Sequence, residues 1–235
     1  MATFVLVHGA WRGGWAYNRV VERLRAKGHR VFNPTLTGLG ERSHLLSHAV
    51  NLTTHMDDVL NLIRFEELEG VVLAGHSYGG MVITGVAERA APGAIASIVY
   101  LDAFLPEDNM SLTDYAPPEH FAAWQAHLKA TDYLSVPPIP AAAFNANEAD
   151  RDWIDRMGVP HPYATMTEKV RVSGGRDRIP KKAYVLATGY EGAAFRGFAA
   201  KAKADPAWAY YEIPCGHDLM LAMPERTAEI LEACA

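Results

Sequence analysis

A serine between glycines is the residue of this sequence best suited to chemistry. Ser77 is the third residue of the run GHSYGG at 75–80, directly after the apolar segment 71–74. On a sharp turn from strand to helix the serine backbone is strained, so the residues two positions away must be small. The helix that follows directs free N–H groups at the reacting oxygen. The pattern predicts a nucleophile at Ser77; the alternative is an idle serine on a glycine-rich turn.

An attack by serine on a carbonyl carbon needs two N–H donors for the oxygen that becomes negative. Tyr78, the residue after the nucleophile, is expected to supply one backbone N–H. Ala10 is expected to supply the other, because it lies in the loop HGAW at 8–11 that follows the first apolar segment. Gly9 lets the backbone of that loop approach a ligand closely, although a plain turn is the alternative. Trp11 is expected to form a wall of the substrate pocket.

The serine proton must pass to a base, and ten histidines compete for this role. His217 follows the last strand candidate in the run PCGH at 214–217, so a loop would carry it over the carboxyl edge of a sheet. Serine first and histidine last is also the chain order of hydrolases that have such a serine turn. We therefore assign the base to His217.

The other histidines are given structural or surface roles. His44, His48 and His55 have roughly helical spacing, but no cysteine or carboxylate cluster joins them, so no metal site is predicted. His76 fills a position of the serine turn. Three more are expected at the surface, with substrate contact as the alternative: His120, His127 and His161.

Short apolar segments alternate with amphipathic ones, and this rhythm indicates an α/β fold with a mostly parallel central sheet and helices on both faces. The expected strands are residues 4–7, 30–32, 71–74, 97–101, 183–187 and 210–213. The expected helices are residues 17–27, 53–67, 79–90, 191–204 and 224–234. Prolines and aromatic residues interrupt the rhythm after residue 105. Residues 1–105 and 181–235 are therefore expected to form the core, and 106–180 a small, mostly helical cap insertion.

The composition of the 235 residues is that of one globular domain, with 49% hydrophobic and 21% charged residues. A net charge of -5 argues against electrostatic binding to nucleic acid or anionic lipid. The two cysteines, Cys215 and Cys234, fit a reducing compartment, and neither a secretory signal nor a membrane-spanning run is evident. We expect a cytoplasmic protein that acts on a small molecule; the sequence leaves its oligomeric state open.

Three segments resemble the esterase and hydroxynitrile-lyase branch of the α/β-hydrolases, which includes plant methyl esterases and small bacterial carboxylesterases. They are FVLVHGAW at 4–11, GHSYGG at 75–80 and YLDAFLP at 100–106. The likeness covers residues 1–110 well and 181–235 moderately, and the opening is similar to the carbendazim-hydrolysing type. Lyases of this branch carry a threonine where this chain has Gly9 and a lysine where it has Asp218. The resemblance therefore implies hydrolysis rather than cyanohydrin cleavage.

The resemblance also implies a triad aspartate just after the penultimate strand, but Tyr190 stands at that position. Asp102, at the end of the preceding strand candidate, could replace it, since related hydrolases use this position. Glu191, displaced by one residue, is the second choice, and a loop-shaping role is the alternative for Asp102. An unpaired carboxylate at an apolar strand end is costly, so Asp102 is expected to have a partner. We predict that it lies roughly 2.6–3.2 Å from His217 Nδ1 and that Glu191 faces solvent.

Together these residues predict a serine esterase that needs no cofactor. Ser77 attacks the carbonyl, His217 moves the proton, and Asp102 orients His217. The aromatic residues of the insertion are expected to line a pocket for a small hydrophobic or aromatic ester, with methyl esters and carbamates among the candidates. Two alternatives stay open: a lyase or another non-hydrolytic reaction on the same scaffold, and a member that binds a ligand without turnover.

Overall fold

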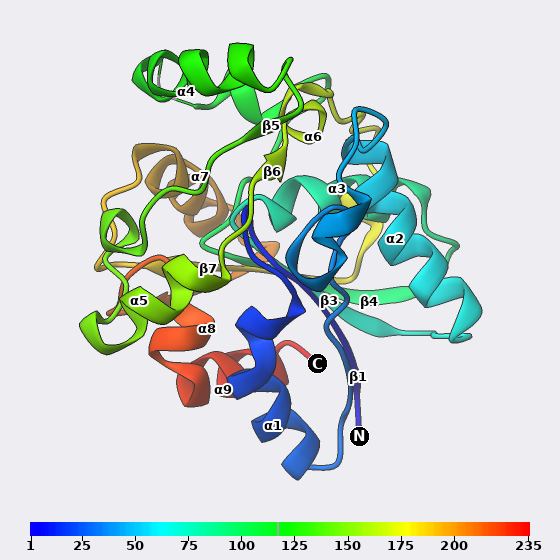
Figure 1. Cartoon of the computed structure of the whole chain (residues 1–235). Helices are drawn as coiled ribbons and strands as arrows, with labels where there is room; N and C mark the ends of the chain where they lie inside the picture. Colours follow the sequence, from blue (N-terminus) through cyan, green and yellow to red (C-terminus); the bar gives the residue numbers. More distant parts are fainter. Residues whose placement is uncertain (117) are drawn as a thin grey trace.

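Six strands form one parallel sheet in the order β2-β1-β3-β4-β7-β8 (Figure 1). The computed structural model describes residues 1–116 and 118–235, and at 118–121 it describes the backbone without the side chains. Every neighbouring pair of strands is parallel, so the carboxyl ends of all six lie at one edge. The predicted α/β fold is confirmed. The strands are β1 (Thr3–Val7), β2 (Arg30–Phe32), β3 (Val71–His76), β4 (Ile95–Leu101), β7 (Lys181–Ala187) and β8 (Trp208–Ile213).

Alternate residues of the central strands pack on opposite faces of the sheet, as the two-residue repeat of a strand requires. In β1, Val5 and Val7 belong to one hydrophobic cluster, and Phe4 and Leu6 to the other. Both sides are apolar because helices cover both faces of a parallel sheet. The first cluster includes α2 (Leu52–Phe65), α3 (Gly79–Arg89) and α7 (Ala193–Ala204), and the second includes α1 (Asn18–Ala26), α8 (Leu219–Ala222) and α9 (Pro224–Ala233).

The core helices α1, α2, α3, α7 and α9 lie where the sequence predicts them, with ends that differ by a few residues, whereas the four-residue α8 was not predicted. The difference that matters is at α7, which begins at Ala193 because the backbone of Gly192 is still extended. Glu191 therefore precedes the helix instead of beginning it. Among the described residues, none of the helices has the length and apolar character that a membrane crossing requires.

The segment between β4 and β7 carries several short elements. Figure 1 shows α4 (Pro118–Ala130), α6 (Ala164–Thr167) and the antiparallel pair β5 (Ser135–Val136) and β6 (His161–Pro162) at one end of the molecule, with α5 (Glu148–Met157) beside the core. The sequence predicts a mostly helical segment; the small sheet is an addition, since two-residue strands have no periodic pattern. Short 3-10 helices complete the chain: Gly14–Tyr17, Gly40–Leu45, Leu112–Asp114, Ala141–Phe144 and Arg176–Arg178.

Carboxylates tie this segment to the core helices. Glu168 accepts hydrogen bonds from the backbone N–H and the hydroxyl of Thr53, in α2, at 2.9 and 2.5 Å. Glu88, in α3, accepts from the N–H groups of Ser173 and Gly175 at 2.8 and 2.9 Å. Charge-assisted hydrogen bonds therefore hold the segment to the core at two places.

Candidate active site

Ser77 lies at the turn between β3 and α3, at the carboxyl edge of the sheet. Its φ of 52° falls in the left-handed region, which residues other than glycine rarely adopt. The turn is tight, because a Cβ added at Gly75 would lie 2.6 Å from the carbonyl oxygen of Gly79. A larger residue at position 75 would therefore displace the backbone that holds Ser77. The strained turn predicted from the sequence is present.

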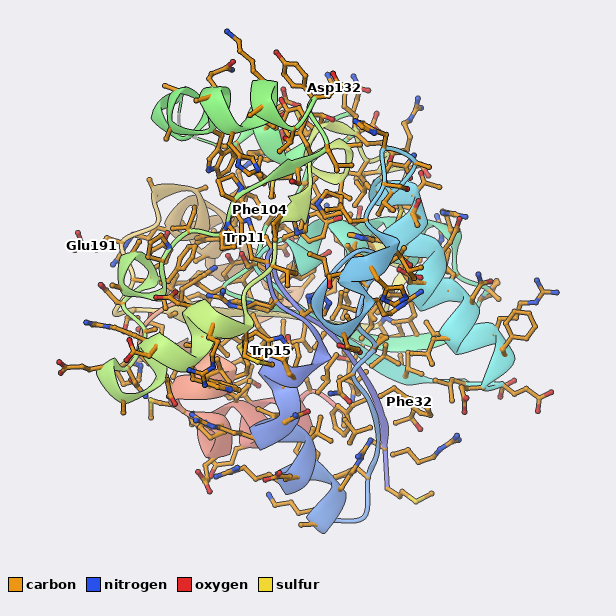
Figure 2. The ribbon with its side chains drawn as sticks, in the orientation of Figure 1. Trp11, Trp15, Phe32, Phe104, Asp132 and Glu191 are labelled. Carbon is orange, nitrogen blue, oxygen red and sulfur yellow. The ribbon has the colours of Figure 1, made fainter. Side chains whose placement is uncertain are left out.

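His217 and Asp102 form a hydrogen bond of 2.6 Å between Nδ1 and Oδ2, and both side chains are buried. Because the carboxylate accepts, His217 carries a proton on Nδ1 and keeps Nε2 available as a base. The second oxygen of Asp102 accepts from the Ala187 N–H at 3.2 Å. The contact has the distance predicted from the sequence. Glu191, by contrast, is exposed and lies at the edge of the molecule (Figure 2).

Backbone hydrogen bonds join Ser77 and Asp102 through the sheet. The Ser77 N–H donates to the Leu101 carbonyl at 3.4 Å, and the Ser77 carbonyl accepts from the Phe104 N–H at 3.1 Å. Asp102, with a φ of 42°, donates its N–H to the Val185 carbonyl at 2.7 Å. Three adjacent strands, β3, β4 and β7, thus fix the positions of the two residues relative to each other.

Four rings pack around the imidazole of His217, and one of them is the imidazole of His76, with 4.5 Å between the centroids. The ring centroids of Phe144, Tyr190 and Phe195 lie 5.3, 4.8 and 4.8 Å from that of the His217 imidazole. Tyr190 stands where the resemblance implies an aspartate. Burial, together with the nearby Asp102 carboxylate, raises the pKa of Tyr190, so the phenol stays neutral and supplies no counter-charge. The carboxylate that contacts the imidazole is that of Asp102, directly after β4.

Ala10 and Tyr78 lie on the two loops that meet at Ser77. In the described part of the chain, the backbone N–H of neither residue donates a hydrogen bond, so both are available to a ligand oxygen. The Gly9–Ala10 peptide is fixed by His8, whose Nδ1–H donates to the Gly9 carbonyl at 2.9 Å. A Cβ at Gly9 would lie 3.0 Å from the Ser77 Cβ, so a threonine there would require its neighbours to move.

A cavity of about 450 Å³ borders Ser77, His217 and the loops that carry Ala10 and Tyr78. Trp11 and Phe104, which lie toward the centre of the molecule in Figure 2, both belong to its wall. Among the described residues, Asp114 is the only acidic or basic side chain other than histidine on that wall. Core and insertion both contribute aromatic rings, which are Trp11, Tyr78, Phe104, Tyr115, Trp124, Phe144, Tyr190 and Phe195. The wall is suited to an uncharged aromatic ligand.

His161 is fully buried, so the surface position predicted for it is wrong. Its Nδ1 accepts from the Trp11 N–H at 3.3 Å, and its ring lies edge-on to Tyr78 with 4.7 Å between centroids. The neighbours that bury it are far away in the sequence, and the local pattern around 161 gives no sign of them. A histidine of the insertion thus contacts both loops that carry the candidate oxyanion donors.

The remaining histidines lie apart from Ser77 or support the fold. His55 is buried, with both ring nitrogens hydrogen-bonded. His44 and His48 are exposed, and His127 is partly buried. Within residues 1–116 and 118–235, excluding the side chains at 118–121, no group of His, Cys, Asp or Glu is arranged to hold a metal ion. The side chain of His120 lies outside the described residues.

Arg12 and Asp218 form a buried ion pair beside the histidine loop, which the sequence did not indicate. Arg12 Nη2 lies 3.0 Å from Asp218 Oδ2, and both side chains are 3% exposed. Burial alone would raise the pKa of Asp218, but the Arg12 guanidinium outweighs it and holds that pKa at about 2. Because Asp218 follows His217 directly, the pair also fixes the end of the loop that carries the base.

Asp218→Asn is expected to lower the free energy of unfolding by about 3–5 kcal/mol, because it leaves the Arg12 charge buried without a partner. The folded-state pKa of Asp218 lies below its ordinary value of 3.8, so its stabilising effect is full above that value and is lost as the pH falls toward 2. Urea unfolding at about pH 7 and about pH 3 measures both effects.

Asp152→Asn, at an exposed carboxylate, is the matched control and should change stability by less than about 0.5 kcal/mol. Equal stability of Asp218→Asn and the parent at neutral pH would contradict this role of the pair.

Comparison with known proteins agrees with the fold. A model of the alpha/beta hydrolase family matches residues 4–230. The chain is 47% identical over 241 residues to the carbendazim hydrolyzing esterase of Nocardioides sp. (strain SG-4G), with 99% of each covered. It is 39% identical over 108 residues to salicylic acid-binding protein 2 of Nicotiana tabacum, covering 44% of this chain and 40% of that protein. Among solved structures, an extracellular alpha/beta-hydrolase from a Paenibacillus species aligns over 100% of this chain and 99% of that protein, with a TM-score of 0.86. At 24% sequence identity, this likeness is one of fold.

Proposed function

The chain belongs to the alpha/beta hydrolase family and is an ester hydrolase, and we propose that it cleaves methyl esters or methyl carbamates of small aromatic compounds through Ser77. The observation that carries this function is the Asp102–His217 hydrogen bond of 2.6 Å beside an aromatic cavity of about 450 Å³ that Ser77 borders. That volume is typical of small-molecule sites. The carbendazim hydrolyzing esterase of Nocardioides supports the carbamate, since carbendazim is the methyl carbamate of an aromatic heterocycle.

Hydrolysis begins with the attack of Ser77 Oγ on the carbonyl carbon. His217 Nε2 takes the hydroxyl proton, while Asp102 holds Nδ1–H in place and balances the positive charge of the imidazolium. The carbonyl oxygen becomes negative and accepts hydrogen bonds from the N–H groups of Ala10 and Tyr78. Each such donor contributes about 2.7–4 kcal/mol to stabilisation of the transition state.

Collapse of the tetrahedral adduct breaks the bond to the methoxy group, and His217 gives its proton to the departing methoxy oxygen, which leaves as methanol. Water then attacks the acyl-enzyme with His217 as the base, which releases the acid and restores the Ser77 hydroxyl. A methyl carbamate follows the same steps and yields a carbamic acid, which loses carbon dioxide to give the amine. Acyl transfer of this kind needs water and the groups of this chain.

Release of methanol from matched substrates tests this function. We expect methyl benzoate and methyl N-phenylcarbamate to have kcat/KM values about 2- to 13-fold above methyl cyclohexanecarboxylate, because an aromatic contact contributes roughly 0.5–1.5 kcal/mol beyond its buried area. The saturated ester is the matched control, since it differs from methyl benzoate only in the ring.

Two outcomes would contradict the proposal. Binding of the aromatic esters without release of methanol would indicate a ligand-binding member of the family. Release of cyanide from mandelonitrile, with no ester turnover, would indicate a lyase.

A further inference from the structure

The insertion contacts the loop that carries one of the two oxyanion donors. Trp11, the residue after Ala10, has a φ of 61°. Its N–H donates to Nδ1 of His161 at 3.3 Å, and its carbonyl accepts from the Val159 N–H at 3.1 Å. Both polar backbone groups of this strained residue therefore bind to one short segment of the insertion. The conformation of the Ala10–Trp11 peptide depends on that segment.

The second oxyanion donor is held through its own side chain. The Tyr78 hydroxyl donates to His55 Nδ1 at 2.8 Å, and His55 Nε2–H donates to the Thr37 carbonyl at 2.8 Å. Tyr78 is fully buried, and the His161 ring packs against it. His161 also lies edge-on to His55, with 6.0 Å between the centroids. The His161 imidazole thus also packs against Tyr78 and against His55, the residue to which the Tyr78 hydroxyl is hydrogen-bonded.

The hydrogen bonds of His161 fix its ring in the neutral tautomer that carries the proton on Nε2. Because Nδ1 accepts from Trp11, the proton is on Nε2, which donates to the Thr165 hydroxyl at 2.8 Å. Thr165 in turn donates to the Pro162 carbonyl at 2.7 Å. Burial lowers the pKa of His161 well below its ordinary value, so the ring stays neutral and keeps its acceptor at neutral pH.

We propose that His161 is a positioning residue of the oxyanion hole, through which the insertion sets the N–H groups of Ala10 and Tyr78 relative to Ser77. The inference rests on the proposed function, which assigns those two N–H groups to the oxyanion. The insertion is then part of the catalytic apparatus as well as a wall of the cavity. His161 acts through Trp11 and Tyr78, and a displacement of about 1 Å at such donors can cost on the order of 100-fold in rate.

His161→Leu tests this role, because leucine occupies a similar volume but has no acceptor for the Trp11 N–H. We expect kcat to fall roughly 10- to 100-fold while KM changes little, since the oxyanion forms only as the carbonyl reacts. His161→Asn places an amide oxygen close to the position of Nδ1, and it should recover most of the loss. Turnover of p-nitrophenyl acetate at saturation gives these values.

An aryl trifluoromethyl ketone provides a readout that a merely structural role would not move. The ketone adds to the serine and forms a hemiketal whose oxygen occupies the oxyanion site, so its inhibition constant reports on that site directly. In His161→Leu the inhibition constant should rise by the same factor by which kcat/KM falls. The rise should be reversed in His161→Asn.

His48→Leu is the matched control. His48 also connects core and insertion, but its hydrogen bond is to Asp132 and not to the loops that carry Ala10 and Tyr78. Its Nε2–H donates to the Asp132 carbonyl at 2.9 Å, and the residue is exposed. It should keep the parent kinetics. Thr165→Val is a milder second variant, which removes the acceptor of His161 Nε2–H and should give a smaller loss of the same kind.

The outcomes separate the two proposals. A parent protein without ester turnover overturns the proposed function. An active parent, together with a His161→Leu variant that keeps kcat and the ketone inhibition constant, overturns the role of His161. A fall in kcat with an unchanged ketone constant also overturns it. If His161→Leu does not fold, Thr165→Val decides by the same two measurements.

Discussion

Ser77→Ala is expected to lower kcat by about 10⁶-fold, the loss seen when the nucleophile of a triad is removed. Without Oγ no acyl-enzyme forms, and the remaining rate comes from substrate binding and the oxyanion N–H groups. The fold should be retained, because the bonds from Ser77 to Leu101 and Phe104 use the backbone alone. Methanol release with enzyme in excess over methyl benzoate measures the rate, and thermal unfolding checks the fold.

A serine-directed fluorophosphonate should label the parent at Ser77 and leave the variant unlabelled, which peptide mass spectrometry can establish. His217→Ala should cost about as much as Ser77→Ala, because the members of a triad act as a unit. His44→Ala, at an exposed histidine, is the matched control and should keep the parent kcat. A label on another residue, or near-normal kcat in Ser77→Ala, would show that the nucleophile is wrongly assigned.

Asp102→Asn is expected to lower kcat by about 10⁴-fold. An amide at this position has no charge to balance the imidazolium, and its NH₂ group would favour the His217 tautomer that carries the proton on Nε2. That tautomer cannot accept the serine proton. The amide oxygen can still accept from the Ala187 N–H, as the carboxylate does at 3.2 Å, so little stability should be lost. Steady-state turnover of methyl benzoate and urea unfolding measure the two effects.

Glu191→Gln removes the competing carboxylate and is the matched control. Glu191 is exposed, so its loss should change kcat by less than about 2-fold. A reversed ranking, in which Glu191→Gln is the damaging change, would mean that the acid of the triad comes from the loop after β7.

Much of the core could be predicted because its signals are local. Buried parallel strands are short apolar runs, and the turn at Ser77 needs glycines that stand out in the sequence. The choice of Asp102 followed from a conflict between the resemblance and the chain: a tyrosine at 190 cannot balance the charge of an imidazolium. Asp102, at the end of the preceding strand, was therefore preferred, with Glu191 as the second choice. The 2.6 Å contact has the predicted distance, and the neighbouring positions of β4 and β7 explain why the exchange is possible.

The parts that could not be predicted depend on partners far away in the sequence. Arg12 and Asp218 are 206 residues apart, and Trp11 and His161 are 150 apart. Nothing near His161 separates a buried histidine from an exposed one, because its burial comes from loops of the core. The pair β5 and β6 was missed for the opposite reason, since two residues are too few for any periodicity to develop.

The proposed position of the acid, directly after β4, has a consequence for how this enzyme can diverge. Backbone hydrogen bonds through neighbouring strands hold Ser77 and Asp102 relative to each other, and the proposed triad takes no member from the loop after β7. Yet Tyr190, Ala193 and Ala194 of that region border the cavity. In a hydrolase whose acid lies in this loop, each change there endangers turnover. With the proposed triad, we expect substitutions at positions 193 and 194 to alter the range of accepted esters while the proton-transfer groups stay in place, so that variants with new substrates can be selected from an enzyme that remains active.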